Sequence, residues 1–182
     1  MGSGQLDAYR ELRHSSMQRF RDTTDPNTAE RIAKDFLVLP GSGPDLETAA
    51  KMAETAVNAP TNHSDMTWFR FAKGLAEYRQ GHFAGAAEWM QKVLSHAGAD
   101  FNRDVEAYMV LAMAHYQTKQ SEEAGVTLAK GLEIAEKKLP KLDSGDLGGG
   151  WLDWIIAHAL MAEAQALIEG RPDTPRNQSK EK

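Results

Sequence analysis

The sequence predicts an all-α fold of about eight helices, and three observations support this prediction. Apolar residues recur at three- and four-residue steps along most of the chain, which is the spacing of one helix face. Alanine, leucine, glutamate and lysine, all good helix formers, dominate the composition. No stretch shows the sustained period-two alternation with β-branched residues that is typical of a strand.

Turn and capping residues divide the chain into the expected helices. Asp25-Pro26 opens the second helix, because proline is tolerated at the first helical position, and Pro40-Gly41 ends it. Asp45 and Ser121 are expected to cap the third and seventh helices, since both side chains can accept hydrogen bonds from a helix N-terminus. The expected helices span residues 6–21, 26–39, 46–58, 66–80, 83–96, 103–118, 121–139 and 151–169.

These helices are expected to form one domain over residues 5–170, which is long enough for a sizeable core. In the first helix, Tyr9, Leu12, Met17 and Phe20 share one face. Residues 1–4 look like an expression scar. Residues 171–182 are polar and contain proline, so we expect a disordered tail.

Composition excludes several function classes. The net charge of -5 argues against a nucleic-acid binder, and the absence of cysteine excludes disulfides and thiolate metal sites. The most apolar segment, residues 151–168, is interrupted by Asp153, His158 and Glu163, so we interpret it as a core helix rather than a membrane span. With no secretory signal at the N-terminus, we expect a cytoplasmic protein that contacts neither membrane nor nucleic acid.

An internal repeat emerges when the chain is shifted by 38 residues. The shift aligns small residues with small ones and large residues with large ones, as stacked helical hairpins require. The aligned pairs are Gly74 with Ala112, Ala76 with Ala114, Tyr78 with Tyr116, Ala86 with Ala124, Met90 with Leu128 and Leu94 with Leu132.

The stretch from Gly74 to Phe83, followed by Ala86, resembles the tetratricopeptide repeat, with its small residue, tyrosine, turn glycine and second-helix alanine. The next unit departs from that family at Lys119, where a turn glycine is usual. The resemblance implies a right-handed superhelical stack of antiparallel helix hairpins. Its clearest repeats would be residues 67–98 and 104–139, with residues 151–169 as a capping helix.

A narrower resemblance involves Thr28-Ala-Glu-Arg, Gly74 to Gly81 and Trp151-Leu-Asp-Trp154. These runs resemble C-terminal repeat segments of large bacterial serine/threonine protein kinases. The chain itself has neither a glycine-rich nucleotide loop nor a His-Arg-Asp motif. The resemblance therefore implies a signalling scaffold without kinase activity.

No residue pattern points to catalysis, a metal or a cofactor. The six histidines include no pair spaced four residues apart, and no nucleophile, base and orienting group come together in the sequence. We therefore expect a non-enzymatic protein with no catalytic residues, no metal site and no cofactor.

The tetratricopeptide resemblance implies that the first helix of each hairpin lines a concave groove. The family's lysine and asparagine clamp for peptide carboxylates is absent, so the groove suits an amphipathic helix of a partner protein or peptide. In the alternative interpretation, neighbouring helices bury the same residues. The candidate groove residues are Trp68, Phe71, Leu75, Tyr78, Arg79, Glu106, Met109, Met113, Tyr116 and Gln117.

The sequence thus favours a non-catalytic protein-interaction or scaffold module. The alternatives are a self-associating structural spacer and a small-ligand sensor. An interaction module is expected to show an open groove and no buried ionisable cluster. A sensor or an enzyme is expected to show a deep pocket with convergent polar groups.

Overall fold

The computed structural model describes residues 3–170, which contain eight α-helices and no strand, so the all-α prediction is confirmed. The expected disordered tail, and residues 1 and 2 of the expected scar, lie outside the described residues. A short 3-10 helix, η1 (Leu142–Ser144), precedes the last α-helix. The α-helices are α1 (Ser3–Phe20), α2 (Pro26–Leu37), α3 (Pro44–Val57), α4 (Met66–Arg79), α5 (Phe83–Leu94), α6 (Phe101–Gln117), α7 (Ser121–Lys138) and α8 (Trp151–Glu169).

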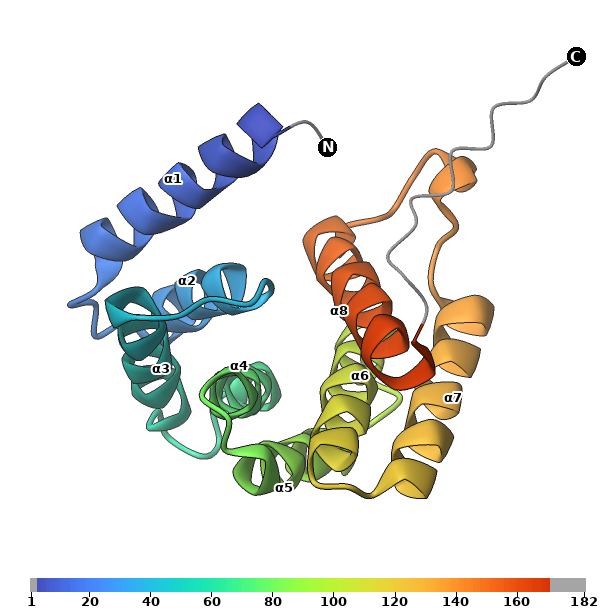
Figure 1. Ribbon diagram of the computed structural model, residues 1–182. Helices are drawn as coiled ribbons and strands as arrows, with labels where there is room; N and C mark the ends of the chain where they lie inside the picture. The colour runs from blue at the N-terminus through green and yellow to red at the C-terminus, as the bar shows by residue number, and fades with distance from the viewer. Residues whose placement is uncertain (1–2, 171–182) are drawn as a thin grey trace, which may run out of the picture.

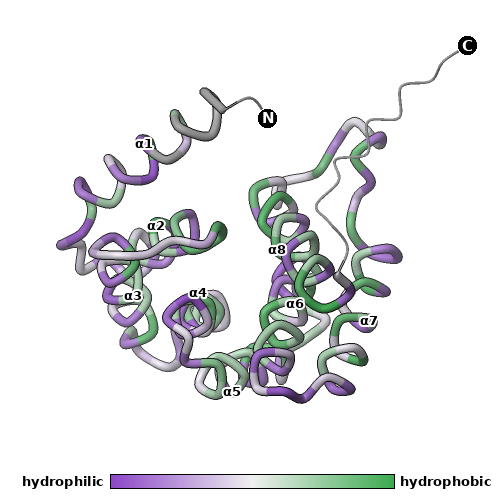
Figure 2. Tube along the Cα trace, viewed as in Figure 1, coloured by the Kyte–Doolittle hydropathy of each residue, from purple (hydrophilic) through white to green (hydrophobic). Residues whose placement is uncertain are grey.

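Consecutive helices pair as hairpins that follow an arc (Figure 1). The pairs are α2 with α3, α4 with α5 and α6 with α7. In Figure 1, α3, α5 and α7 form the outer side of the arc, and α2, α4 and α6 form its inner side. Helix α8 lies on the inner side against α6, while α1 packs on α2 and α3. Figure 2 shows that α8 is hydrophobic along most of its length.

Local capping explains where some helices begin. Asp25 caps α2 by accepting a hydrogen bond of 2.8 Å from the Thr28 backbone N–H, and Pro26 takes the first helical position as predicted. The predicted caps at Asp45 and Ser121 are wrong. Pro44 already starts α3, so Asp45 lies inside its first turn, and Ser121 is likewise the first residue of α7 rather than its cap.

The 38-residue repeat is visible in the backbone. A Cβ atom at Gly74 would lie 2.4 Å from Met90 Cε and 2.8 Å from Trp89 Cβ, so α4 and α5 approach each other closely where the sequence has no side chain. Gly81 has a φ of 82°, and Lys119, which is 38 residues later, has a φ of 66°. The two turns therefore share one left-handed conformation, although only Gly81 has the residue that this conformation favours.

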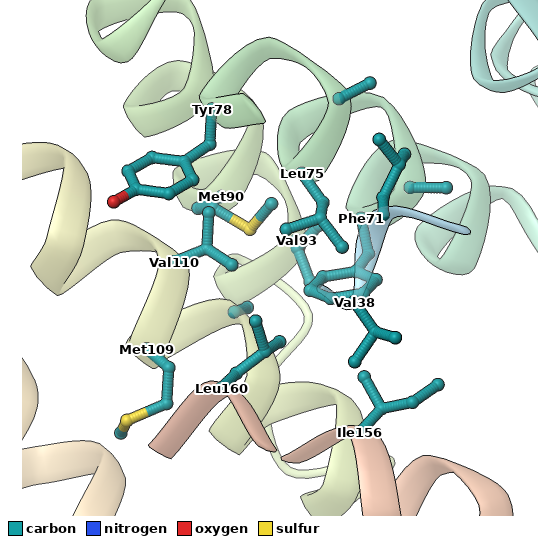
Figure 3. Packing of buried hydrophobic residues seen from close by; sticks show 14 of the residues in the cluster. Val38, Phe71, Leu75, Tyr78, Met90, Val93, Met109, Val110, Ile156 and Leu160 are labelled. Carbon is teal, nitrogen blue, oxygen red and sulfur yellow. The ribbon is translucent and has the colours of Figure 1, made fainter. Parts of the chain in front are cut away.

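The core runs between the two layers of the arc (Figure 3). The apolar face of α1 is only partly buried, because Met17 is fully covered whereas Leu12 remains 62% exposed. Leu12 stays exposed because α1 packs only against α2 and α3, at one edge of the arc. Within residues 3–170, no helix combines the length and the apolar character that a membrane crossing requires.

Candidate binding site

Five charged residues of the described part of the chain are buried over both backbone and side chain, and they lie on α2 and α6. Charged residues are rarely buried unless they are paired, because removing a charge from water is costly. The exposed fractions are 5% for Glu30, Lys34 and Arg103, 1% for Asp104 and 0% for Glu106.

Lys34 is the centre of this group. Its Nζ lies 3.1 Å from Glu30 Oε1, one turn earlier on α2, and 2.8 Å from Asp153 Oδ1 in the first turn of α8. The ammonium also lies 4.3 Å from the centre of the Trp68 ring, within cation–π range. Burial lowers the pKa of Lys34, but the carboxyl groups of Glu30, Glu106 and Asp153 outweigh burial and raise it, so the side chain stays charged.

Glu106 has no partner for either carboxyl oxygen within the described residues, although its side chain is fully buried on α6. Burial raises its pKa well above the usual range. Lys34 opposes that shift, while Asp153 and Glu30 reinforce it. Glu106 therefore holds its proton more tightly than an exposed glutamate does.

Arg103 and Asp104 fix the turn between α5 and α6. Arg103 Nη2 donates to the backbone oxygen of His96 at 3.1 Å and lies 3.1 Å from Asp104 Oδ1. Asp104 Oδ2 accepts a 2.5 Å hydrogen bond from the Gly98 backbone N–H. This pair is engaged in local structure, so the pocket chemistry rests on the group around Lys34.

An acidic pocket of about 280 Å³ opens beside Lys34. Four carboxylates and two cationic side chains line it, and the indole of Trp68 and the side chain of Leu152 add apolar walls. Burial raises the pKa of Asp35 and of Glu30 in this wall, and Lys34 opposes both shifts. The lining residues are Asn27, Glu30, Arg31, Lys34, Asp35, Asp65, Trp68, Leu152 and Asp153.

An apolar hollow of about 210 Å³ adjoins the acidic pocket, and Asp35 and Leu152 belong to the walls of both. Its remaining walls come from α1 and α2. Arg13 closes one side, because its guanidinium donates to the backbone oxygen of Phe36 and lies 4.3 Å from the Phe36 ring centre. The lining residues are Tyr9, Leu12, Arg13, Ser16, Ile32, Asp35, Phe36 and Leu152.

The ten candidate groove residues do not share one environment. Trp68 lines the acidic pocket, whereas Glu106 is fully buried and does not line it. Tyr116 and Gln117 are half-buried. Tyr78 is 7% exposed, and burial raises the pKa of its phenol. The apolar residues that are fully buried are Phe71, Leu75, Met109 and Met113.

Helix α8 accounts for much of this burial. Figure 3 shows Ile156 and Leu160 of α8 pointing toward the side chains of the inner helices, among them Phe71. Arg79 fastens α8 in this position through an ion pair with Glu163, whose Oε2 lies 2.7 Å from Nη2. A partner could contact the fully buried groove residues only after α8 had moved, and their role in binding stays a prediction.

Sequence reasoning missed Lys34, Glu30 and Asp153 as site residues. Glu30 and Lys34 are four positions apart, so they lie on the same side of α2. Each directly follows a core alanine, Ala29 or Ala33, and this pattern is a local signal for charges near a buried helix face. No local signal links them to Asp153, because that contact spans 119 positions in the sequence.

Comparisons with known proteins bring no relative to this site. No protein-family model matches the chain, and no curated protein matches it. The resemblance to the tetratricopeptide repeat therefore rests on the residues of the two units described above. Within residues 3–170, no group of three or more histidine, aspartate or glutamate side chains could hold a metal ion.

Proposed function

We propose that the chain is a non-catalytic protein-interaction module of the tetratricopeptide type, which holds a segment of a partner protein at the inner edge between α1, α2 and α8. The observation that carries the proposal is the pair of adjoining hollows. One is acidic and the other apolar, and they share Asp35 and Leu152. Two neighbouring hollows of different character suit a segment that presents two kinds of side chain.

Exposed apolar side chains also favour this surface as the binding site. Leu152 is 43% exposed, and its neighbours on α8, Trp151 and Ile155, are 54% and 46% exposed. Leu12 of α1 is 62% exposed in the wall of the apolar hollow. Large apolar side chains that gather at the rim of a hollow are typical of protein contact surfaces.

The proposal also includes the larger protein in which this module works. The resemblance to C-terminal segments of bacterial serine/threonine protein kinases supports a role as a scaffold within a larger cytoplasmic signalling protein. In that role the module brings a partner close to another part of the same protein, and its own residues carry out no reaction.

Selection from a random peptide library tests the proposal. Peptides enriched on the wild-type chain are expected to bind Leu152→Asn about tenfold more weakly, because they lose an apolar contact of 1 to 2 kcal/mol, roughly the value of a partly buried leucine. Val126→Asn is the matched control, because Val126 is 66% exposed on α7, away from both hollows. Failure to enrich any peptide, or equal binding to Leu152→Asn, would refute the proposed surface.

The oligomeric state is measured on the same variants. Light scattering is expected to show a monomer at the concentrations used for binding. A dimer that dissociates in Leu152→Asn would instead assign the surface to a second copy of the chain, as the structural-spacer alternative requires.

A small-ligand sensor is a second candidate, and the buried ionisable group around Lys34 and Glu106 supports it. An interaction module is expected to have no such buried group, whereas a sensor or an enzyme is expected to have a deep pocket with convergent polar groups. This candidate is tested by adding a set of charged small molecules, one at a time, and measuring the melting temperature of the chain. A rise that Asp65→Asn removes, together with a failure to enrich any peptide, would favour the sensor over the interaction module.

A further inference from the structure

The charges around the acidic pocket do not balance. Glu30, Asp35, Asp65 and Asp153 face only Lys34 and Arg31. Lys34 is already engaged by two of these carboxylates, at 3.1 and 2.8 Å. The pocket therefore has a negative potential that a further cation would reduce.

The carboxylate of Asp65 takes no part in holding the fold together. No hydrogen bond or ion pair joins its side chain to another part of residues 3–170. It precedes the first residue of α4, yet makes no capping hydrogen bond. A charged group with no structural partner at the wall of a pocket can bind a ligand without disturbing the fold.

Glu106 is a second and independent observation. It is fully buried, and neither of its oxygens accepts a hydrogen bond from the described residues. Buried polar atoms are nearly always paired in proteins, and leaving one unpaired costs about 1–3 kcal/mol. Glu106 also couples electrostatically to Lys34, Asp153 and Glu30, all of which line the pocket.

The walls of the pocket fit an alkyl chain that ends in a cation. The Trp68 indole already lies 4.3 Å from the Lys34 ammonium and 5.7 Å from the Arg103 guanidinium, so this ring lies where cations gather. Leu152 provides apolar surface for a methylene stem, and the carboxylates surround the charged end. Lysine and arginine side chains combine these two features.

We propose that the acidic pocket binds one lysine or arginine side chain, placed between Trp68, Asp65 and Asp153. The inference deepens the proposed function and rests on it for the source of this side chain, namely the partner segment. An apolar side chain of the same segment then occupies the adjoining hollow beside Leu152. A free alkyl diamine or alkylguanidine has the same chemistry and is the ligand that the sensor candidate requires.

Small probes test the pocket without any peptide. Nα-acetyl-arginine methylamide and Nα-acetyl-lysine methylamide are titrated into the full chain, and the Trp68 indole N–H signal is followed by NMR after assignment with Trp68→Phe. At least one of the two is expected to give a saturable shift. The matched citrulline derivative, which keeps the shape and loses the charge, is expected to bind at least about tenfold more weakly.

Two variants locate the contact. Asp65→Asn is expected to weaken binding of the cationic probe at least about threefold, because one carboxylate of the pocket loses its charge. Asp143→Asn, an exposed residue of η1, is the matched control and is expected to leave binding unchanged. Equal binding of the citrulline and arginine probes, an unaffected Asp65→Asn, or no saturable shift at Trp68 would each overturn the inference.

The results also separate this inference from the proposed function. If library peptides bind in a Leu152-dependent way but the cationic probes do not, the interaction surface stands and the cation site is refuted. If the probes bind with the expected dependence on Asp65 while no peptide is enriched, the cation site stands with a free small molecule as its ligand, and the interaction function fails.

Discussion

Replacing Arg79 with methionine is expected to lower the free energy of unfolding by about 3 kcal/mol. The Arg79 guanidinium connects three elements. Its Nε donates to the backbone oxygen of Leu37 at 2.8 Å, and its Nη2 donates to the backbone oxygen of Val38 at 2.9 Å, at the end of α2. The same group pairs with Glu163 of α8. Methionine keeps an unbranched apolar stem and removes every one of these bonds.

The magnitude follows from what the substitution leaves behind. The Arg79 side chain is only 4% exposed, so its bonds form away from water, whereas Glu163 is 25% exposed and regains part of its hydration. Removing one partner of a buried ion pair costs about 3–5 kcal/mol, and the partial exposure of Glu163 places this case at the lower end. For a domain with a stability of roughly 5–15 kcal/mol, that loss is large.

Urea unfolding followed by far-UV circular dichroism measures the effect. Arg21→Met is the matched control, because Arg21 is 58% exposed and pairs only with an exposed aspartate, so a change below about 0.5 kcal/mol is expected. A loss below about 1 kcal/mol for Arg79→Met would refute the assignment of Arg79 as the residue that holds α8 against α2 and α4. It would instead leave the side chain available for a partner, as the groove prediction assumed.

Three further predictions use the same unfolding measurement. Because burial raises the pKa of Glu106 above its usual 4.5, the folded chain retains a proton that the unfolded chain releases, so stability falls as the pH rises above that value; Glu106→Gln is expected to make this slope shallower, and an unchanged slope would contradict the burial argument. Gly74→Ala is expected to cost about 1–3 kcal/mol by forcing α4 away from α5, whereas Gly125→Ala, with no atom near its added Cβ, is expected to gain up to about 1 kcal/mol from helix propensity; equal effects would argue against a close approach at Gly74. Lys119→Gly is expected to stabilise the chain by about 1 kcal/mol because glycine tolerates the positive φ, and a loss of stability would contradict the strain.

Local rules predicted the parts of the fold that local chemistry decides. The start of α2 follows from Asp25 and Pro26, because a cap and a first-position proline act on the adjacent turn. The start of α3 was misplaced because Asp45 and Pro44 are both helix-start signals, and the proline took the first position. Lys119 departs from the expected glycine, yet its backbone keeps the left-handed conformation, since the short turn between α6 and α7 requires it whatever the side chain.

The candidate site depends on a contact that no local rule contains. The tetratricopeptide resemblance assigned Trp68 and Glu106 to the first helices of hairpins, and Trp68 lines the acidic pocket. It did not predict that Asp153 would reach Lys34 across 119 positions. That contact depends on where α8 lies, and the glycine-rich connection before α8 does not determine its direction from the sequence.

The position of α8 changes what the inner side of the arc can offer a partner. By covering Phe71, α8 converts part of the groove that the tetratricopeptide resemblance implies into core. The N-terminal turn of α8 simultaneously brings Asp153 and Leu152 to the edge of α2, where they complete the acidic pocket and the apolar hollow. A chain shortened before Trp151 is therefore expected to expose the apolar groove and lose the cation site together. The Trp68 signal in the probe titration separates that outcome from simple unfolding, because a folded chain without α8 keeps a dispersed Trp68 resonance that no longer responds to the cationic probe.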